Sequence, residues 1–216
     1  MEIVNLNDIR KPPLVIGDDD YWKAVDGYED FFKLVNPINY EFTTNPETTT
    51  VKRREISCYE NACLLKVEDK NWKEDWAIFY FLQSSDEYYQ LGSINESIWE
   101  INKKAKLVLK KSSIPDYLKI LLYFYTISES GSVLFFEGPE SEFSPIFPFS
   151  NELEKKKIFG KLKPPIISGP DKKGGFIVKC TIYDRDRLLW VELELNKNGE
   201  AQYTNMELLQ SFEIPE

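Results

Sequence analysis

The fold class follows from residues 176–208, which read FIVKCTIYDRDRLLWVELELNKNGEAQYTNMEL. This stretch contains three runs rich in aliphatic and aromatic residues, at 176–183, 188–195 and 200–208. Such runs are typical of β-strands when charged and turn-forming residues separate them. The second connection ends in Asn198-Gly199, and Asn-Gly between alternating apolar runs strongly favours a tight hairpin. The C-terminal part of the chain is therefore predicted to form antiparallel strands.

A second set of strands is predicted nearer the N-terminus. Runs at 51–59, 62–68 and 76–83 have the same aromatic and aliphatic character, and short turn-forming segments separate them. They predict an antiparallel meander, which residues 88–91 either extend or follow as a turn. Residues 133–136 read as one further strand.

Two helices are predicted between these sets of strands. Ser93 and Glu96 match a capping box, and apolar residues then recur at helical spacing, which predicts a helix over 94–111. Ser113-Ile-Pro115-Asp116 begins a second helix, over 114–128, because proline favours the first turn of a helix. The second helix is apolar almost all round, so it is predicted to be buried.

Nearer the N-terminus, the apolar residues between 21 and 35 also recur every three or four positions. They predict a helix whose first turn is capped by the acidic triplet Asp18, Asp19 and Asp20. Together these elements predict an α+β fold in which one antiparallel sheet, built from strands of both the N-terminal and C-terminal parts, packs against the helix pair at about 94–128. A single domain over 1–216 is expected, with an irregular Pro-rich segment at about 138–174.

Composition excludes several classes of function. The chain has 36 acidic and 27 basic residues, a net charge of −9, which argues against a nucleic-acid binder. It has no His, so Ser-His-Asp and Cys-His catalysis and His-ligated zinc are excluded. No phosphate-binding glycine pattern and no complete ligand set is present, so neither a cofactor nor a metal is expected. No catalytic residue is assigned.

Three motifs have a chemical and a structural interpretation. The triplet at 18–20 resembles a carboxylate pair for Mg²⁺, but helix capping is the simpler explanation. Asp184 and Asp186 could act as paired carboxylates, or form a charge-balanced turn with their neighbouring arginines. The lysines at 103–111 form either a basic patch for an acidic partner or a solvated helix face. In each case the structural interpretation is preferred.

The location expected is cytoplasmic. The chain has three cysteines, Cys58, Cys63 and Cys180, and this small, odd number does not suggest a disulfide framework. They are interpreted as small apolar residues of strands. The first residues lack the pattern of a secretory signal. The longest apolar run is short of the roughly 20 residues that a membrane span requires.

Aromatic residues make up 14% of the chain, and some lie where regular core packing is not expected. Phe143, Phe147 and Phe149 belong to the Pro-rich segment, and Trp72 and Trp76 bracket a charged turn. Aromatic side chains on loops are favoured anchors at protein interfaces. These five residues are therefore predicted to bind a partner; the alternative is that they pack on the chain's own core.

The function expected is a non-enzymatic protein–protein binding module, such as an inhibitor, immunity-type or accessory protein. The acidic surface favours a basic partner. The alternatives are a His-independent enzyme that uses carboxylate, Lys or Cys chemistry, and a secreted effector or scaffold.

Overall fold

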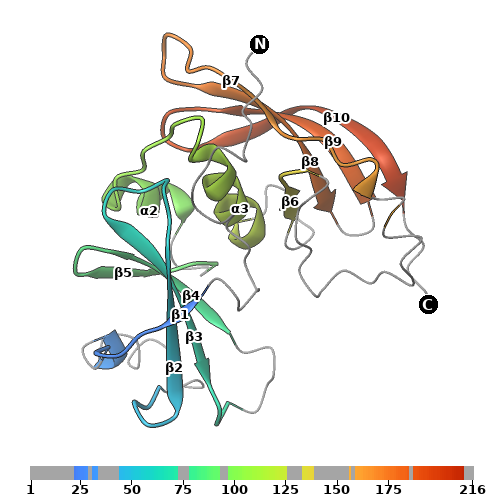
Figure 1. Cartoon of the computed structure of the whole chain (residues 1–216). Helices are drawn as coiled ribbons and strands as arrows, with labels where there is room; N and C mark the ends of the chain where they lie inside the picture. The colour runs from blue at the N-terminus through green and yellow to red at the C-terminus, as the bar shows by residue number, and fades with distance from the viewer. Residues whose placement is uncertain are drawn as a thin grey trace.

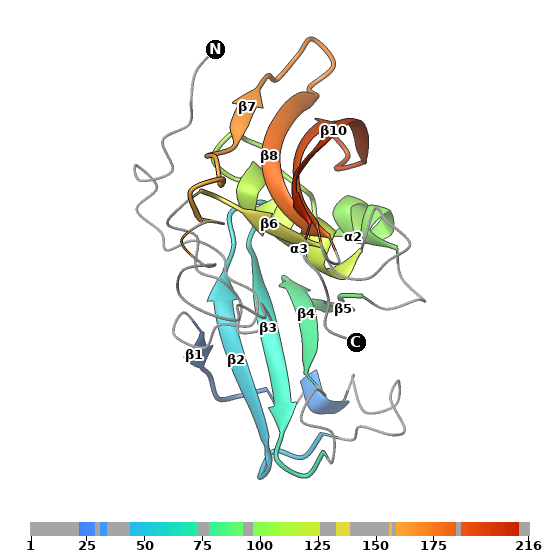
Figure 2. The same cartoon turned by 90° about the vertical axis from the view of Figure 1, so that its right-hand side faces the viewer.

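The structure is a computed structural model that describes residues 22–28, 31–33, 44–72, 78–92, 97–125, 133–138, 156, 159–184 and 187–211. Within these residues the chain is predominantly β. The strands form two antiparallel sheets, and two helices lie between the sheets (Figures 1 and 2).

The N-terminal sheet has the strand order β1-β2-β3-β4-β5. The predicted meander is confirmed, with each strand pairing antiparallel to the next. The segment at 88–91 extends the sheet through β5 and is not merely a turn. The strands are β1 (Lys23–Ala24), β2 (Thr49–Glu55), β3 (Ala62–Asp69), β4 (Phe79–Ser84) and β5 (Glu87–Gln90).

The C-terminal sheet has the order β10-β9-β8-β6, and β7 also pairs with β8. The three strands predicted within 176–208 are confirmed as β8 to β10. The prediction that 138–174 is irregular is wrong at β7, because residues 166–168 pair with 177–179 of β8. The strands are β6 (Leu134–Phe136), β7 (Ile166–Ser168), β8 (Phe176–Asp184), β9 (Arg187–Leu195) and β10 (Ala201–Ser211).

The prediction of one sheet built from both parts of the chain is wrong, because the N-terminal and C-terminal strands form separate sheets. The helices α2 (Ile98–Lys104) and α3 (Ile114–Phe124) lie between the two sheets (Figures 1 and 2). The largest hydrophobic cluster contains Leu64 of the first sheet, Val191 of the second and Leu121 of α3. Apolar helices that are buried all round can cover a sheet on either side, and sequence patterning does not distinguish one sheet from two.

Helix α2 is shorter than the predicted helix over 94–111. It begins after Ser97, whose hydroxyl accepts the N–H of Glu100, and it ends at Lys104; Ser93 lies outside the described residues. Beyond Ala105 the chain turns at Lys106 (φ 54°) and pairs with the segment after β2: the N–H of Val108 donates to Cys58, and Leu107 forms a bridge with Tyr59. Backbone pairing with a distant segment therefore ends the helical stripe early.

The predicted helix between 21 and 35 is wrong over Lys23–Ala24, which form β1 and pair with Lys52 and Arg53 of β2. Gly27 has φ 84°, which is outside helical geometry. Of the described residues between 21 and 35, only residues 31–33 are helical. Phe31 and Phe32 instead pack on the face of the first sheet that points away from the helices, together with Leu65, Val67 and Phe81. The Asp18–Asp20 triplet lies outside the described residues.

Helix α3 confirms the core prediction for the second helix. Leu121 is 1% exposed, and Ile101 of α2 is fully buried. Replacing Leu121 with Ala is expected to lower the free energy of unfolding by about 2–4 kcal/mol, because the lost transfer energy adds to that of a cavity that closes only partly. Urea denaturation of wild type and variant measures this loss, and a change below about 1 kcal/mol would contradict the burial of this side chain.

Candidate partner-binding surface

Four of the five predicted partner-binding residues, Phe143, Phe147, Phe149 and Trp76, lie outside the described residues, and their role stays a prediction. Trp72 is described and is half-buried. Its ring packs edge to face on Phe79, with ring centroids 5.3 Å apart, beside the cluster that contains Phe31 and Phe81. Trp72 therefore contacts the chain's own second cluster, and its role toward a partner also stays a prediction.

The cysteines do not have the environment of nucleophiles. All three thiols are free and buried. Burial raises the pKa of Cys63 to about 11, and it also raises the pKa values of Cys58 and Cys180 well above the ordinary value of a thiol. A thiol reacts as the thiolate, which such burial suppresses.

Acidic groups do not converge on a metal site within the part of the chain that the structure describes, since no three Asp, Glu or Cys side chains there gather closely enough to hold an ion. Asp184 is buried, and its carboxylate lies 3.2 Å from the guanidinium of Arg187. Its predicted companion Asp186 lies outside the described residues.

One buried ion pair joins α3 to the end of β6. The Nζ of Lys119 lies 2.9 Å from the carboxylate of Glu137, and these side chains are 11% and 17% exposed. Burial lowers the pKa of Lys119, although the carboxylate of Glu137 partly opposes this shift. Both charges are thus partnered within the chain, where they connect a helix to the second sheet.

A buried hydrogen-bond network anchors the turn between β9 and β10. The hydroxyl of Tyr59 donates to Asn102 Oδ1 (2.5 Å), and Asn102 Nδ2 donates to the Tyr117 hydroxyl (2.8 Å) and to the carbonyl of Asn198 (3.0 Å). The Tyr117 hydroxyl in turn donates to the carbonyl of Gly199 (2.7 Å). The network therefore ties the turn to both helices and to the segment after β2.

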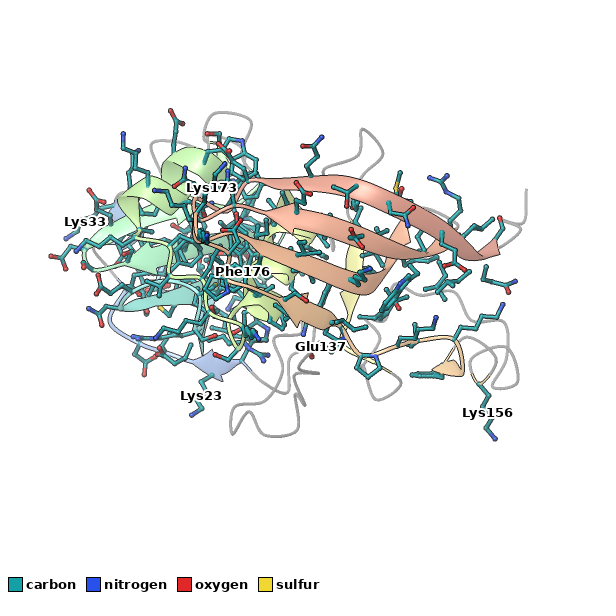
Figure 3. The ribbon with its side chains drawn as sticks, turned by 90° about the horizontal axis from the view of Figure 1, so that it is seen from above. Lys23, Lys33, Glu137, Lys156, Lys173 and Phe176 are labelled. Atoms are coloured by element: carbon teal, nitrogen blue, oxygen red, sulfur yellow. The ribbon has the colours of Figure 1, made fainter. Side chains whose placement is uncertain are left out.

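Strand β10 starts at this anchored turn and runs away from it for 11 residues. A strand rises about 3.4 Å per residue, so residues 206–208 lie about 17–24 Å beyond Ala201. Helices α2 and α3 lie near the end of the sheet at which β10 begins, and the other end of the sheet lies away from them (Figures 1 and 3). The far half of β10 consequently extends beyond the cover of the helices.

Two large apolar side chains are exposed in this far half. Met206 is 59% exposed and Leu208 is 57% exposed. Met206 lies opposite Val191, and Leu208 lies opposite Leu189; both partners on β9 are buried in the main cluster. Residues opposite each other in a sheet share a face. Met206 and Leu208 therefore continue the core face of the second sheet to a place where the described chain leaves them exposed.

The opposite face of the same region carries carboxylates. Glu207 is exposed and lies opposite Trp190, and Asn205 lies opposite Glu192. A hydrogen bond from Lys179, at 2.6 Å, holds the pKa of Glu192 below its ordinary value. Glu194 and Glu207 are exposed and make no ion pair with any described residue. We call the segment 205–208, with Met206 and Leu208 on its inner face and Glu207 on its outer face, the β10 surface.

Sequence reasoning recognised this strand but not its exposed apolar residues. Met206 and Leu208 alternate with polar residues as the buried residues of β9 do, so local pattern does not separate them. Strand order was the missing information, because β10 is an edge of its sheet.

Comparison with protein-family models, with curated proteins and with solved structures gave no match. Among the described residues, no helix combines the length and apolarity needed to cross a membrane.

Proposed function

We propose that this chain is a non-enzymatic protein-binding module that binds a basic partner through the β10 surface. The observation that carries the proposal is the exposure of Met206 and Leu208, at 59% and 57%, beside each other on a sheet edge. Clustered exposed apolar side chains on a folded domain are typical of interaction sites. An inhibitor, immunity-type or accessory role in the cytoplasm fits such a surface.

The charge of the partner follows from the surroundings of this surface. Glu194 and Glu207 are exposed on the outer face, and the chain as a whole carries −9. The outer face already attracts cations of the chain itself, since Lys179 pairs with Glu192 and Lys163 lies 5.2 Å from the ring centroid of Trp190. Complementary charge raises association rates and disfavours wrong partners.

The experiment is an affinity measurement with a purified partner that is recovered together with the wild-type chain. The variant Met206→Thr/Leu208→Thr is expected to weaken binding at least tenfold, because central apolar anchors typically contribute more than about 1.4 kcal/mol. Ile177→Thr is the matched control, since Ile177 is 42% exposed on the same sheet but lies on its outer face, opposite Glu194.

Two results would count against the proposal. One is unchanged affinity in the double variant with the fold intact by circular dichroism. The other is an affinity that does not fall as salt rises, since charge attraction between exposed groups is screened within about 10 Å at 0.1 M salt.

A His-independent enzyme is the second candidate, and the pair Lys119–Glu137 is the observation that favours it, because a buried amine beside a carboxylate is a common acid–base arrangement. We rank it second because each charge is already partnered by the other. A secreted effector or scaffold is a third role, and no structural feature favours it.

A further inference from the structure

We infer that the partner binds as an extended strand of alternating apolar and basic residues that adds to the C-terminal sheet along residues 205–208 of β10. This inference rests on the proposed function and specifies the conformation and the chemical pattern of the bound segment.

The free edge of β10 provides the backbone groups. Strand β10 pairs with β9 alone, and no described strand occupies its other side. An edge strand presents unpaired N–H and C=O groups, onto which an extended peptide can add as a further strand. The main-chain hydrogen bonds of such an addition contribute affinity without regard to sequence, so the side chains must supply the specificity.

The available length of this edge is short and sharply bounded. The β10–β9 register shifts between Tyr203 and Asn205 and again between Leu208 and Gln210. At the far boundary, the ammonium group of Lys161 donates a hydrogen bond to the carbonyl of Leu209 (3.1 Å). Bulges and lysines are common protections of sheet edges. They leave residues 205–208 as the regular run on which a strand can pair.

The two faces of this run determine the side chains that fit. Successive residues of an added strand point to opposite faces. Those on the inner face meet Met206 and Leu208, which favour apolar side chains. Those on the outer face meet Glu207, whose exposed carboxylate favours Lys or Arg. An alternating apolar and basic segment satisfies both faces at once.

A second copy of the chain fits this edge less well. Residues 201–211 contain Glu207 but no Lys or Arg, so β10 of a second copy brings no cation to the outer face. Each copy also carries −9, and like charges oppose association. Charge complementarity therefore selects a basic strand from a different protein.

The test uses four synthetic peptides with blocked ends. The first is Val-Lys-Val-Lys-Val-Lys; the second has the same composition in blocks, Val-Val-Val-Lys-Lys-Lys; the third and fourth are the first with N-methyl groups on alternate residues. The block peptide keeps the charge but not the alternation. Two N-methylated forms, with the methyl groups on the valines or on the lysines, keep the side chains but each remove one set of N–H donors. Binding to the wild-type chain is measured by amide chemical-shift titration.

The alternating peptide is expected to bind at least tenfold more tightly than the block peptide, and at least one N-methylated form is expected to lose tenfold in affinity. The chemical-shift changes should centre on residues 205–208. The affinity for the alternating peptide should fall at least fivefold in Met206→Thr/Leu208→Thr and stay unchanged in Ile177→Thr. Glu207→Gln should weaken binding of the alternating peptide while leaving the fold unchanged.

Three outcomes would overturn the inference. They are equal binding of the alternating and block peptides, full binding of both N-methylated forms, and a concentration-dependent dimer of the wild-type chain that Met206→Thr abolishes. In the first two cases the proposed function survives if the purified partner still depends on Met206 and Leu208, because the surface would then bind without adding a strand. Loss of that dependence would remove the proposed function as well.

Discussion

Replacing Gly199 with Ala is expected to lower the free energy of unfolding by about 3–5 kcal/mol, enough to unfold a marginal domain. Gly199 has φ 89°, where a residue with a Cβ is strained by about 1–2 kcal/mol. The added Cβ would also lie 2.5 Å from Asn102 Nδ2 and 2.7 Å from Leu107 Cδ2, and it would overlap the Tyr117 hydroxyl. Overpacking of this kind costs a further 1–3 kcal/mol or so.

Gly27 supplies the matched control. Its φ of 84° is nearly the same, but a Cβ at this position meets nothing within 4 Å. Gly27→Ala therefore measures backbone strain alone, and urea denaturation should show a loss of about 1–2 kcal/mol. Adding Tyr117→Phe to Gly199→Ala should recover part of the loss, because it removes the hydroxyl that the methyl group overlaps. Equal losses in the two glycine variants would show that the buried network does not confine the turn.

Replacing Glu137 with Gln is expected to lower the free energy of unfolding by about 3–5 kcal/mol at pH 7, because it leaves the buried ammonium of Lys119 without its countercharge. The loss should shrink as pH rises. Burial already lowers the pKa of Lys119 in the folded wild type, so the unfolded chain binds the proton more tightly and stability rises with pH. Without Glu137 this dependence should strengthen, since its carboxylate opposes the lowering of the Lys119 pKa more strongly than that of Asp116 does.

The double variant Lys119→Met/Glu137→Gln decides between a charge effect and a packing effect. If the unpaired ammonium causes the instability, the double variant should be more stable than Glu137→Gln alone, because it removes the unpaired charge. Urea denaturation of the wild type, Lys119→Met, Glu137→Gln and the double variant at pH 7 and at pH 9.5 measures the coupling. Strictly additive losses that do not change with pH would show that the two charges are not coupled.

Local pattern predicted much of the secondary structure. Three parts of the fold were recognisable: the meander at 51–83, the three strands at 176–208 and the second helix. In each element, apolar residues recur at regular spacing, and turn-forming residues lie on either side. Patterns of this kind reflect which residues are buried, and burial of Leu121 and Ile101 followed from them. The expectation of a basic partner came from net charge alone and enters the proposed function unchanged.

Long-range pairing decided the elements where prediction was wrong. Residues 23–24 lie in a helix-like pattern, but they pair with β2, and residues 106–108 leave the helical stripe to pair with 58–60. In both places a distant backbone supplies hydrogen bonds that a local pattern does not encode. The same limitation hid strand β7, which is short and owes its structure to β8.

The sequence by itself determined that the chain is rich in antiparallel strands, has a buried second helix, carries a large negative charge and lacks His chemistry. Only the tertiary structure decided that the strands form two sheets on opposite sides of the helices, and that β10 lies at an edge. Met206 and Leu208 show the difference most clearly. Their alternation is that of a core strand, but they are exposed because β10 is the edge strand of its sheet, whereas Val191 and Leu189, which lie opposite them on β9, are buried.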